Sequence, residues 1–209
     1  MTAARGRDDV ASRRAIARSM AGLMLITALG LGGCVKLGSK LPEQLISLTP
    51  RAVAPAGAIG QGRYADAVVV LDPSAERRLD VQRVPVRVDG ATVAYLKGAT
   101  WVEKPARQFR RVLAETLRAR GGRLVVESDD YDAAGKIVLS GRLLEMGYDA
   151  TSRSVVVRYD ALREDADGTI RAQRFEAVVP GVSPKTQFVA PALNKAANDV
   201  AAQVADWLG

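Results

Sequence analysis

Few side chains in this 209-residue chain are chemically reactive, and the first to consider is its single cysteine, Cys34. A thiol can act as a nucleophile, as a metal ligand or as the attachment point of a covalent group. The chain has no histidine, the commonest general base and metal ligand. Composition therefore excludes a Ser-His-Asp triad, a Cys/His zinc site and an intramolecular disulfide. What remains for acid–base chemistry is a carboxylate pair as in glycoside hydrolysis, with Glu103, Glu127 and Glu145 as candidates.

The residues before Cys34 have the pattern of an export signal. Residues 1–19 are polar and basic, and residues 20–33 are apolar and uncharged. As a helix, the apolar run would span about 20 Å, which is short of a bilayer core of about 30 Å. A basic start, a short apolar run and small residues at its end are typical of a secretory signal peptide. We therefore expect residues 1–33 to be a cleavable signal peptide.

Cys34 follows two glycines at the end of the apolar run. The sequence Leu31-Gly32-Gly33-Cys34 resembles the lipobox of bacterial lipoproteins. This resemblance implies that Cys34 receives diacylglycerol, that the chain is cut before it, and that the new amino terminus is acylated. Two or three acyl chains, at about 0.8 kcal/mol per buried CH₂, anchor a protein stably. The expected lipid is covalent, and no other cofactor is expected; the alternative is a free thiol after an uncleaved anchor helix.

Two short features concern export and sorting. Ser12-Arg13-Arg14-Ala15-Ile16 also resembles a twin-arginine signal, so the general secretory and twin-arginine routes both stay open. Val35, and not an aspartate, follows Cys34, which resembles lipoproteins sorted to the outer membrane. We expect a lipid anchor in the outer membrane and a domain that faces the periplasm.

The elements that follow predict one α+β domain. Residues 34–43 are expected to be a flexible tether and residues 44–209 the domain. Asp89-Gly90 and Asp167-Gly168 are hairpin signals, and Gly141 and Gly147 are expected at bulges or bends. Strands are predicted over residues 44–48, 66–71, 79–88, 91–96, 123–127, 136–148, 154–163 and 169–179. Helices are predicted from Pro105 to Gly121-Gly122 and from Pro191 to Leu208, so we expect a twisted antiparallel sheet with two helices packed on one face.

The charge distribution does not favour nucleic acid as a partner. The formal net charge is +7, but five arginines lie before residue 34. A nucleic-acid-binding domain is expected to keep a dense basic stripe. The nearest candidate is on the first predicted helix, and it comprises Arg107, Arg110, Arg111, Arg118 and Arg120. Because Glu103 and Glu115 interrupt this set, we interpret it as a solvated helix face.

Residues 83–117 read RVPVRVDGATVAYLKGATWVEKPARQFRRVLAETL. They combine a proline after a β-rich run, a hairpin, and Trp101-x-Glu103-x-Pro105 at the start of a helix. This pattern resembles the ABC-type transport auxiliary lipoprotein family, over about residues 45–208. The family pattern usually has leucine or a similar residue after the proline, and Ala106 stands here instead.

The resemblance implies a non-catalytic envelope lipoprotein with the α+β fold already expected. Its partners would be an MCE-domain protein of the paraquat-inducible type and the ABC permease and ATPase of that system. The cargo would be phospholipid or a related hydrophobic molecule, and a homo-oligomer, such as a ring, is compatible with this role.

Two further interpretations accompany the resemblance. Trp101, Glu103 and Pro105 fit either a structural role or direct contact with a partner. In the structural role, Trp101 covers the core, Glu103 favours the helix N-terminus, and Pro105 starts the first turn. The alternative function is a stand-alone envelope lipoprotein that binds peptidoglycan or saccharide, or a carboxylate-based hydrolase.

Overall fold

The computed structural model describes residues 44–58, 60–63, 66–128 and 137–209. These residues belong to one compact unit, residues 42–209. Its strands are β1 (Val68–Leu71), β2 (Ser74–Ala75), β3 (Arg83–Arg87), β4 (Val93–Thr100), β5 (Val125–Ser128), β6 (Ile137–Asp149), β7 (Ser154–Glu164) and β8 (Ile170–Val179). Its helices are α2 (Pro105–Arg120) and α3 (Thr186–Leu208). In the described part of the chain, neither helix is long and apolar enough to cross a bilayer.

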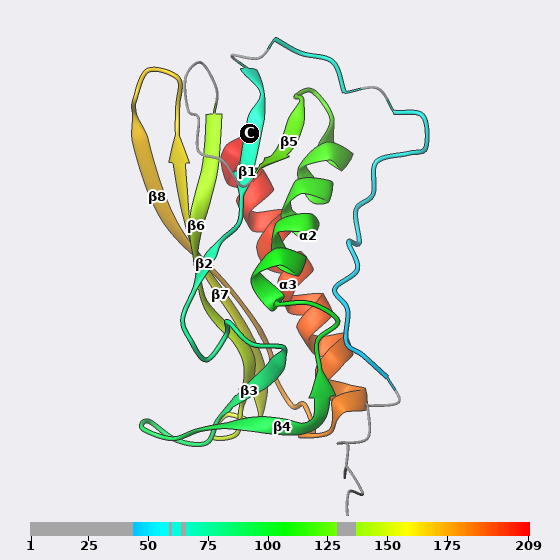
Figure 1. Cartoon of the computed structure of the whole chain (residues 1–209), viewed down its shortest axis with the longest axis vertical. Helices are drawn as coiled ribbons and strands as arrows, with labels where there is room; N and C mark the ends of the chain where they lie inside the picture. Colours follow the sequence, from blue (N-terminus) through cyan, green and yellow to red (C-terminus); the bar gives the residue numbers. More distant parts are fainter. Residues whose placement is uncertain (1–43, 59, 64–65, 129–136) are drawn as a thin grey trace, which may run out of the picture. The chain divides into compact units, whose positions relative to one another are not determined.

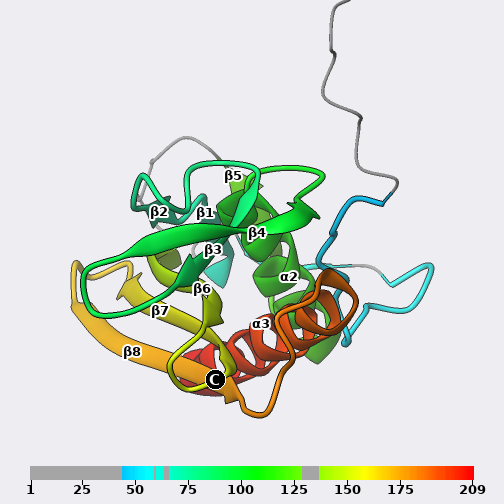
Figure 2. The same ribbon diagram turned by 90° about the horizontal axis from the view of Figure 1, so that it is seen from below.

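The eight strands form one mixed sheet, and both helices lie on the same side of it (Figure 2). The strand order is β4-β3-β6-β1-β5, with β2 and β7 also paired to β6 and β8 paired to β7. The α+β class and the two-helix layer are therefore confirmed. The hairpin signals at Asp89-Gly90 and Asp167-Gly168 are confirmed as well, because β3–β4 and β7–β8 are antiparallel pairs.

The prediction of an antiparallel sheet is wrong for four of the seven strand pairings. Strand β1 pairs in parallel with both β5 and β6, and β6 also pairs in parallel with β2 and β3. The chain passes from β1 to β5 through β2, β3, β4 and α2, and α2 returns over one face of the sheet, so β5 comes back parallel to β1. The run of buried valines in β1 fits this position, since parallel strands are covered on both faces.

Two local predictions about the ends of the domain are corrected. Helix α3 begins at Thr186 and not at Pro191, which lies inside the helix. The helix extends before this proline because Val189 is fully buried and its N–H bonds to the Lys185 carbonyl. Residues 44–48 form no strand and contribute one isolated parallel bridge, Ile46 to Trp101, while the Leu48 N–H bonds to the Gln108 side chain of α2.

The predicted bulges in β6 occur at another position. The register shift lies between Leu143 and Glu145. Gly141 and Gly147 instead permit close approach: a Cβ at Gly141 would lie 2.6 Å from the Tyr159 ring, and one at Gly147 would collide with the Pro85 carbonyl.

The core fills the space between the sheet and the two helices. Phe109 of α2 meets Tyr159 of β7 edge to face, with ring centroids 5.2 Å apart. Phe175 of β8 meets Trp207 of α3 in the same way at 5.6 Å. Buried alanines on α3 let that helix approach the sheet closely, and they comprise Ala192, Ala196, Ala197, Ala201 and Ala205. This packing fixes the side chains of both helices that point toward the amino-terminal segment.

Candidate functional site

The three candidate carboxylates lie on three different segments, and each is held by arginines. Glu103 precedes α2, Glu127 is on β5, and Glu145 is on β6. The ion pairs are Glu103 with Arg107 and Arg111, Glu127 with Arg110 and Arg118, and Glu145 with Arg78, Arg87 and Arg158. The hydrogen bond from Arg111 lowers the pKa of Glu103, whereas a general acid needs a raised pKa. This arrangement links neighbouring elements and does not favour the carboxylate-hydrolase alternative.

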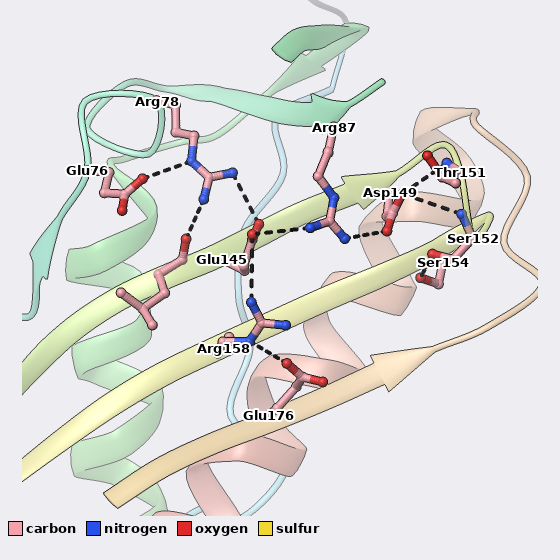
Figure 3. Close-up of polar contacts among 11 residues, drawn as sticks. Glu76, Arg78, Arg87, Glu145, Asp149, Thr151, Ser152, Ser154, Arg158 and Glu176 are labelled. Atoms are coloured by element: carbon pink, nitrogen blue, oxygen red, sulfur yellow. Dashed lines mark hydrogen bonds and ion pairs between the residues drawn. The ribbon is translucent and has the colours of Figure 1, made fainter. Parts of the chain in front are cut away.

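Glu145 is the centre of an ion-pair network on the sheet face that points away from the helices (Figure 3). Its side chain is only 15% exposed and lies 3.2 Å from Arg78 and 3.9 Å from both Arg87 and Arg158. Arg78 also donates to the Leu144 carbonyl at 2.8 Å. One carboxylate thus joins the segment before β3, strand β3 itself and strand β7 across β6.

Asp149 extends this network to the β6–β7 turn (Figure 3). Its carboxylate accepts hydrogen bonds from Arg87, from the Thr151 N–H at 2.9 Å and from Ser152. Burial acts to raise the pKa of Asp149, but these hydrogen bonds outweigh it and lower that pKa to about 2. The cavity beside Arg87 and Asp149 has a volume of about 10 Å³, which is room for one water molecule. The network stabilises the sheet and offers no space for a ligand there.

The Trp101-x-Glu103-x-Pro105 motif forms the connection from β4 to α2. Trp101 is 1% exposed and belongs to the hydrophobic core. Among the described residues, its indole Nε1 has no hydrogen-bond acceptor. Pro105 is the first residue of α2, where its missing N–H costs nothing. The structure therefore places Trp101 and Pro105 in the interior, while Glu103 stays partly exposed beside its arginines.

Gln108 joins this motif to the amino-terminal segment. Its side chain is 1% exposed, although glutamine is rarely buried. Its Nε2 donates to the Glu103 carbonyl at 2.7 Å, and its Oε1 accepts from the Leu48 N–H at 2.9 Å. One buried amide thus satisfies the nearby Glu103 carbonyl and the N–H of Leu48, a residue 60 positions away from Gln108 in sequence.

The amino-terminal segment is fixed along the helices by further side-chain amides. We call residues 44–54 the N-terminal strap; it runs beside α2 and α3 (Figure 1). The Thr49 N–H donates to Asn194 at 2.8 Å, and the Arg51 N–H donates to Asn198 at 2.6 Å. Asn198 also donates to the Thr49 carbonyl at 2.9 Å. These bonds replace the strand ladder that the sequence predicted for residues 44–48.

A carboxylate closes the far end of the strap. Glu115 on α2 accepts a hydrogen bond from the Ala54 N–H at 2.8 Å. An ion pair between Arg51 and Asp199 of α3 lies beside the asparagine contacts, at 3.1 Å. Both helices therefore contribute side chains, and the strap is attached at four backbone N–H groups.

The strap-binding amides were not predicted from the sequence. Gln108 and Asn198 are buried on helices whose other buried positions are apolar except for Thr116, and Asn194 is half-buried. Asn194 and Asn198 are four residues apart and so share one helix face. A polar amide at positions where the helical period predicts burial was the available signal, because such a group must find a partner.

The residues that carry the anchoring prediction lie outside the described residues. These are Cys34 and the lipobox residues Leu31, Gly32 and Gly33. The first described residue, Gln44, begins the strap ten positions after Cys34.

Known proteins share this fold. The crystal structure of protein XCC0632 from Xanthomonas campestris, of the family DUF330, superposes with a TM-score of 0.62 at 21% identity, and covers 79% of this chain and 94% of that one. A second crystal structure, of an uncharacterized protein, has a TM-score of 0.60 at 12% identity, and covers 79% of this chain and 100% of the other. These identities establish the fold alone.

Sequence comparison identifies the family. No curated protein matches the sequence. The family model described as "ABC-type transport auxiliary lipoprotein component" matches residues 47–205, which include the strap from Ser47 onward, the β4–α2 motif and nearly all of α3. The chain therefore belongs to the family of auxiliary lipoprotein components of ABC-type transport systems.

Proposed function

We propose that this protein is a non-catalytic, lipid-anchored component of an MCE-type transport system in the cell envelope. Its lipid is attached to Cys34 in the outer membrane, and its domain faces the periplasm. There it contacts an MCE-domain protein, which an ABC permease and ATPase serve. The cargo of the system is phospholipid or a related hydrophobic molecule.

Family membership is the observation that carries this proposal. An auxiliary lipoprotein needs an acylated cysteine, and Cys34 stands at the end of a sequence that resembles a lipobox. The MCE partner and the phospholipid cargo come from the resemblance in residues 83–117. The small cavity at the sheet face and the ion-paired carboxylates support a role in attachment and docking in preference to chemistry.

The strap supports the anchoring part of the proposal. An anchored domain must withstand tension on its amino-terminal end, and residues 48, 49, 51 and 54 are each bonded to a helix side chain. The chain between Cys34 and Gln44 spans at most about 35 Å when extended. The domain consequently stays close to the membrane that holds Cys34.

Two measurements test this proposal. Mass spectrometry of the protein from membranes should find an amino-terminal Cys34 with diacylglyceryl and acyl groups. In-cell crosslinking, detergent extraction and purification through a carboxy-terminal tag should recover an MCE-domain protein together with an ABC permease.

A Cys34→Ser variant is the matched control for both measurements. It should lose the lipid and retain residues 1–33, because cleavage depends on the modified cysteine. Recovery of peptidoglycan or saccharide without any transporter component would contradict the proposal and favour the stand-alone alternative.

A further inference from the structure

The start of the N-terminal strap lies beside β4 and the first turn of α3 (Figure 2). The Ile46 N–H donates to the Thr100 carbonyl at 2.8 Å, and the Thr186 hydroxyl lies 3.4 Å from the Lys97 carbonyl. An open groove of about 710 Å³ separates residues 44–46 from the first turns of α3. Leu45 and Lys185 line this groove. Lys97 lies beside it, because its carbonyl is the one that Thr186 contacts, and the Phe188 N–H bonds to the Lys185 carbonyl at 2.9 Å. We call the four residues Leu45, Lys97, Lys185 and Phe188 the N-terminal patch.

Two large apolar side chains of the N-terminal patch face solvent. Leu45 is 53% exposed and Phe188 is 48% exposed. Phe188 lies in the first turn of α3, next to Val189, which is fully buried. The helix therefore turns Val189 into the core and leaves about half of the Phe188 side chain exposed to solvent.

The same surface carries the lysines that have no acidic partner. The structure describes four lysines, Lys97, Lys104, Lys185 and Lys195. Lys104 pairs with Asp80 at 2.8 Å, and Lys195 pairs with Asp199 at 2.6 Å. Within the described residues, Lys97 and Lys185 form no ion pair, and both are exposed. The two unpaired lysines are thus gathered on the N-terminal patch with two exposed apolar side chains.

The patch is also the part of the domain nearest to Cys34 along the chain. Leu45 is eleven residues from Cys34, a span of at most about 40 Å. Exposed apolar side chains flanked by lysines are suited to the boundary between lipid headgroups and acyl chains. Each lysine near an anionic membrane surface adds a favourable electrostatic contribution.

We propose that the N-terminal patch rests on the surface of the bilayer that holds the anchor, and that it recognises anionic phospholipid. Lys97 and Lys185 contact the phosphates, and Leu45 and Phe188 enter the headgroup region. This inference rests on the proposed function through the lipid on Cys34. The anchor supplies most of the membrane affinity, and the patch sets which side of the domain faces the lipid.

The test uses the lipidated protein as it is extracted from membranes. The protein is reconstituted into phosphatidylcholine vesicles with or without phosphatidylglycerol, and flotation measures anchoring. Acetylation of surface amines followed by mass spectrometry then measures the accessibility of each lysine. We expect anchoring to both vesicles, with Lys97 and Lys185 labelled roughly threefold to fivefold more slowly on the anionic vesicles, as expected for cations held at such a surface. Labelling of Lys195 should be the same on both.

A matched pair of double variants isolates the patch. Phe188→Ser with Lys185→Gln removes one exposed apolar side chain and one cation, and should return Lys97 to its phosphatidylcholine labelling rate. Ile170→Ser with Arg171→Gln also replaces one exposed apolar side chain and one cation, here one paired with Asp165. These residues lie at the start of β8, next to the β7–β8 hairpin and at the other end of the domain from the start of α3 (Figure 1). This second variant should leave the protection of Lys97 and Lys185 intact.

The outcomes separate this inference from the proposed function. Failure to float with either vesicle would refute the lipid anchor, and with it the proposed function. Flotation with both vesicles but equal labelling of Lys97 and Lys185 would overturn the patch alone.

Discussion

Asp149 shows at the residue scale how a buried side chain keeps its charge in this domain. The residue is 7% exposed, and its carboxylate accepts hydrogen bonds from Arg87, the Thr151 N–H and Ser152. These bonds favour the ionised form more strongly than burial disfavours it, so the pKa falls from 3.8 to about 2. Because the native pKa lies below the unfolded one, the stabilisation is complete above about pH 5. It is lost as the pH falls through 4 toward 2.

Substitution of this carboxylate should therefore reveal a pH-dependent stability. Asp149→Asn is expected to lower the free energy of unfolding by about 1–2 kcal/mol at pH 7, because it removes the ionic part of the Arg87 contact. The difference should shrink to near zero at about pH 2, where wild-type Asp149 begins to be protonated. Urea unfolding at several pH values measures this.

Asp206→Asn is the control for that experiment. Asp206 is 69% exposed and pairs with Arg120 on the surface, so its loss should cost less than about 0.5 kcal/mol at any pH. Equal effects of the two substitutions would contradict the role assigned to Asp149.

At the scale of elements, the strap bonds to the end of β4 at Ile46, and beyond that residue it depends on side chains of the helices. Asn198 is 4% exposed and bonds to the strap at Arg51 and Thr49. Its position on α3 is fixed by the buried neighbours Ala197 and Val200. The helix that completes the core thereby also holds the residues through which the chain enters the domain.

Removal of this amide should loosen the strap locally. Asn198→Ala is expected to lower the free energy of unfolding by about 1–3 kcal/mol, because backbone groups at Thr49 and Arg51 lose their partners. Hydrogen exchange should accelerate at the Arg51 amide and remain unchanged in β7. Lys195→Ala, on the same helix but 60% exposed, should leave exchange of Arg51 as in the wild type. Unchanged exchange in Asn198→Ala would show that the strap is held in another way.

Elements that begin or end at a proline or glycine were predictable from the sequence, and elements that depend on distant partners were not. Pro105 and Gly121-Gly122 bound α2 where expected, because each acts on its own backbone: both glycines have positive φ, 69° and 81°. The parallel pairs of β1 have no such local signal, since they arise from the return of the chain through α2. The start of α3 was predicted five residues too late because Pro191 was given the first turn, although burial of Val189 extends the helix before it.

The candidate site follows the same division. The residues of the predicted lipobox and of the Trp101–Pro105 motif are contiguous, so both could be predicted from the sequence alone; the lipobox lies outside the described residues and stays a prediction. The strap contacts join residues 60 to 149 positions apart, and no local pattern encodes such pairings. The one available signal for Gln108 and Asn198 was a polar amide side chain at a position where the helical period predicts a buried apolar residue.

At the scale of the whole molecule, anchoring and folding should be separable. Cys34 lies ten positions before Gln44, and the domain core is built from Ile46 onward. A Cys34→Ala variant is therefore expected to unfold within about 2 °C of the wild type in the same detergent, since no core contact changes. Circular dichroism during heating measures this, and a large decrease in the unfolding temperature would show that the lipidated terminus contributes to the fold.

The geometry of the strap also determines how the domain bears mechanical load. A force applied at residue 44 along the strap acts parallel to the helices, and it stretches the bonds at residues 48, 49, 51 and 54 together. Loading in shear distributes tension among several hydrogen bonds, whereas peeling would break them one after another. The bonds of Ile46 to Thr100 and Val102 join the strap to the end of β4, so they receive the force first, and the helix side chains take up the rest. A tethered domain built in this way spreads the tension over the end of β4 and both helices.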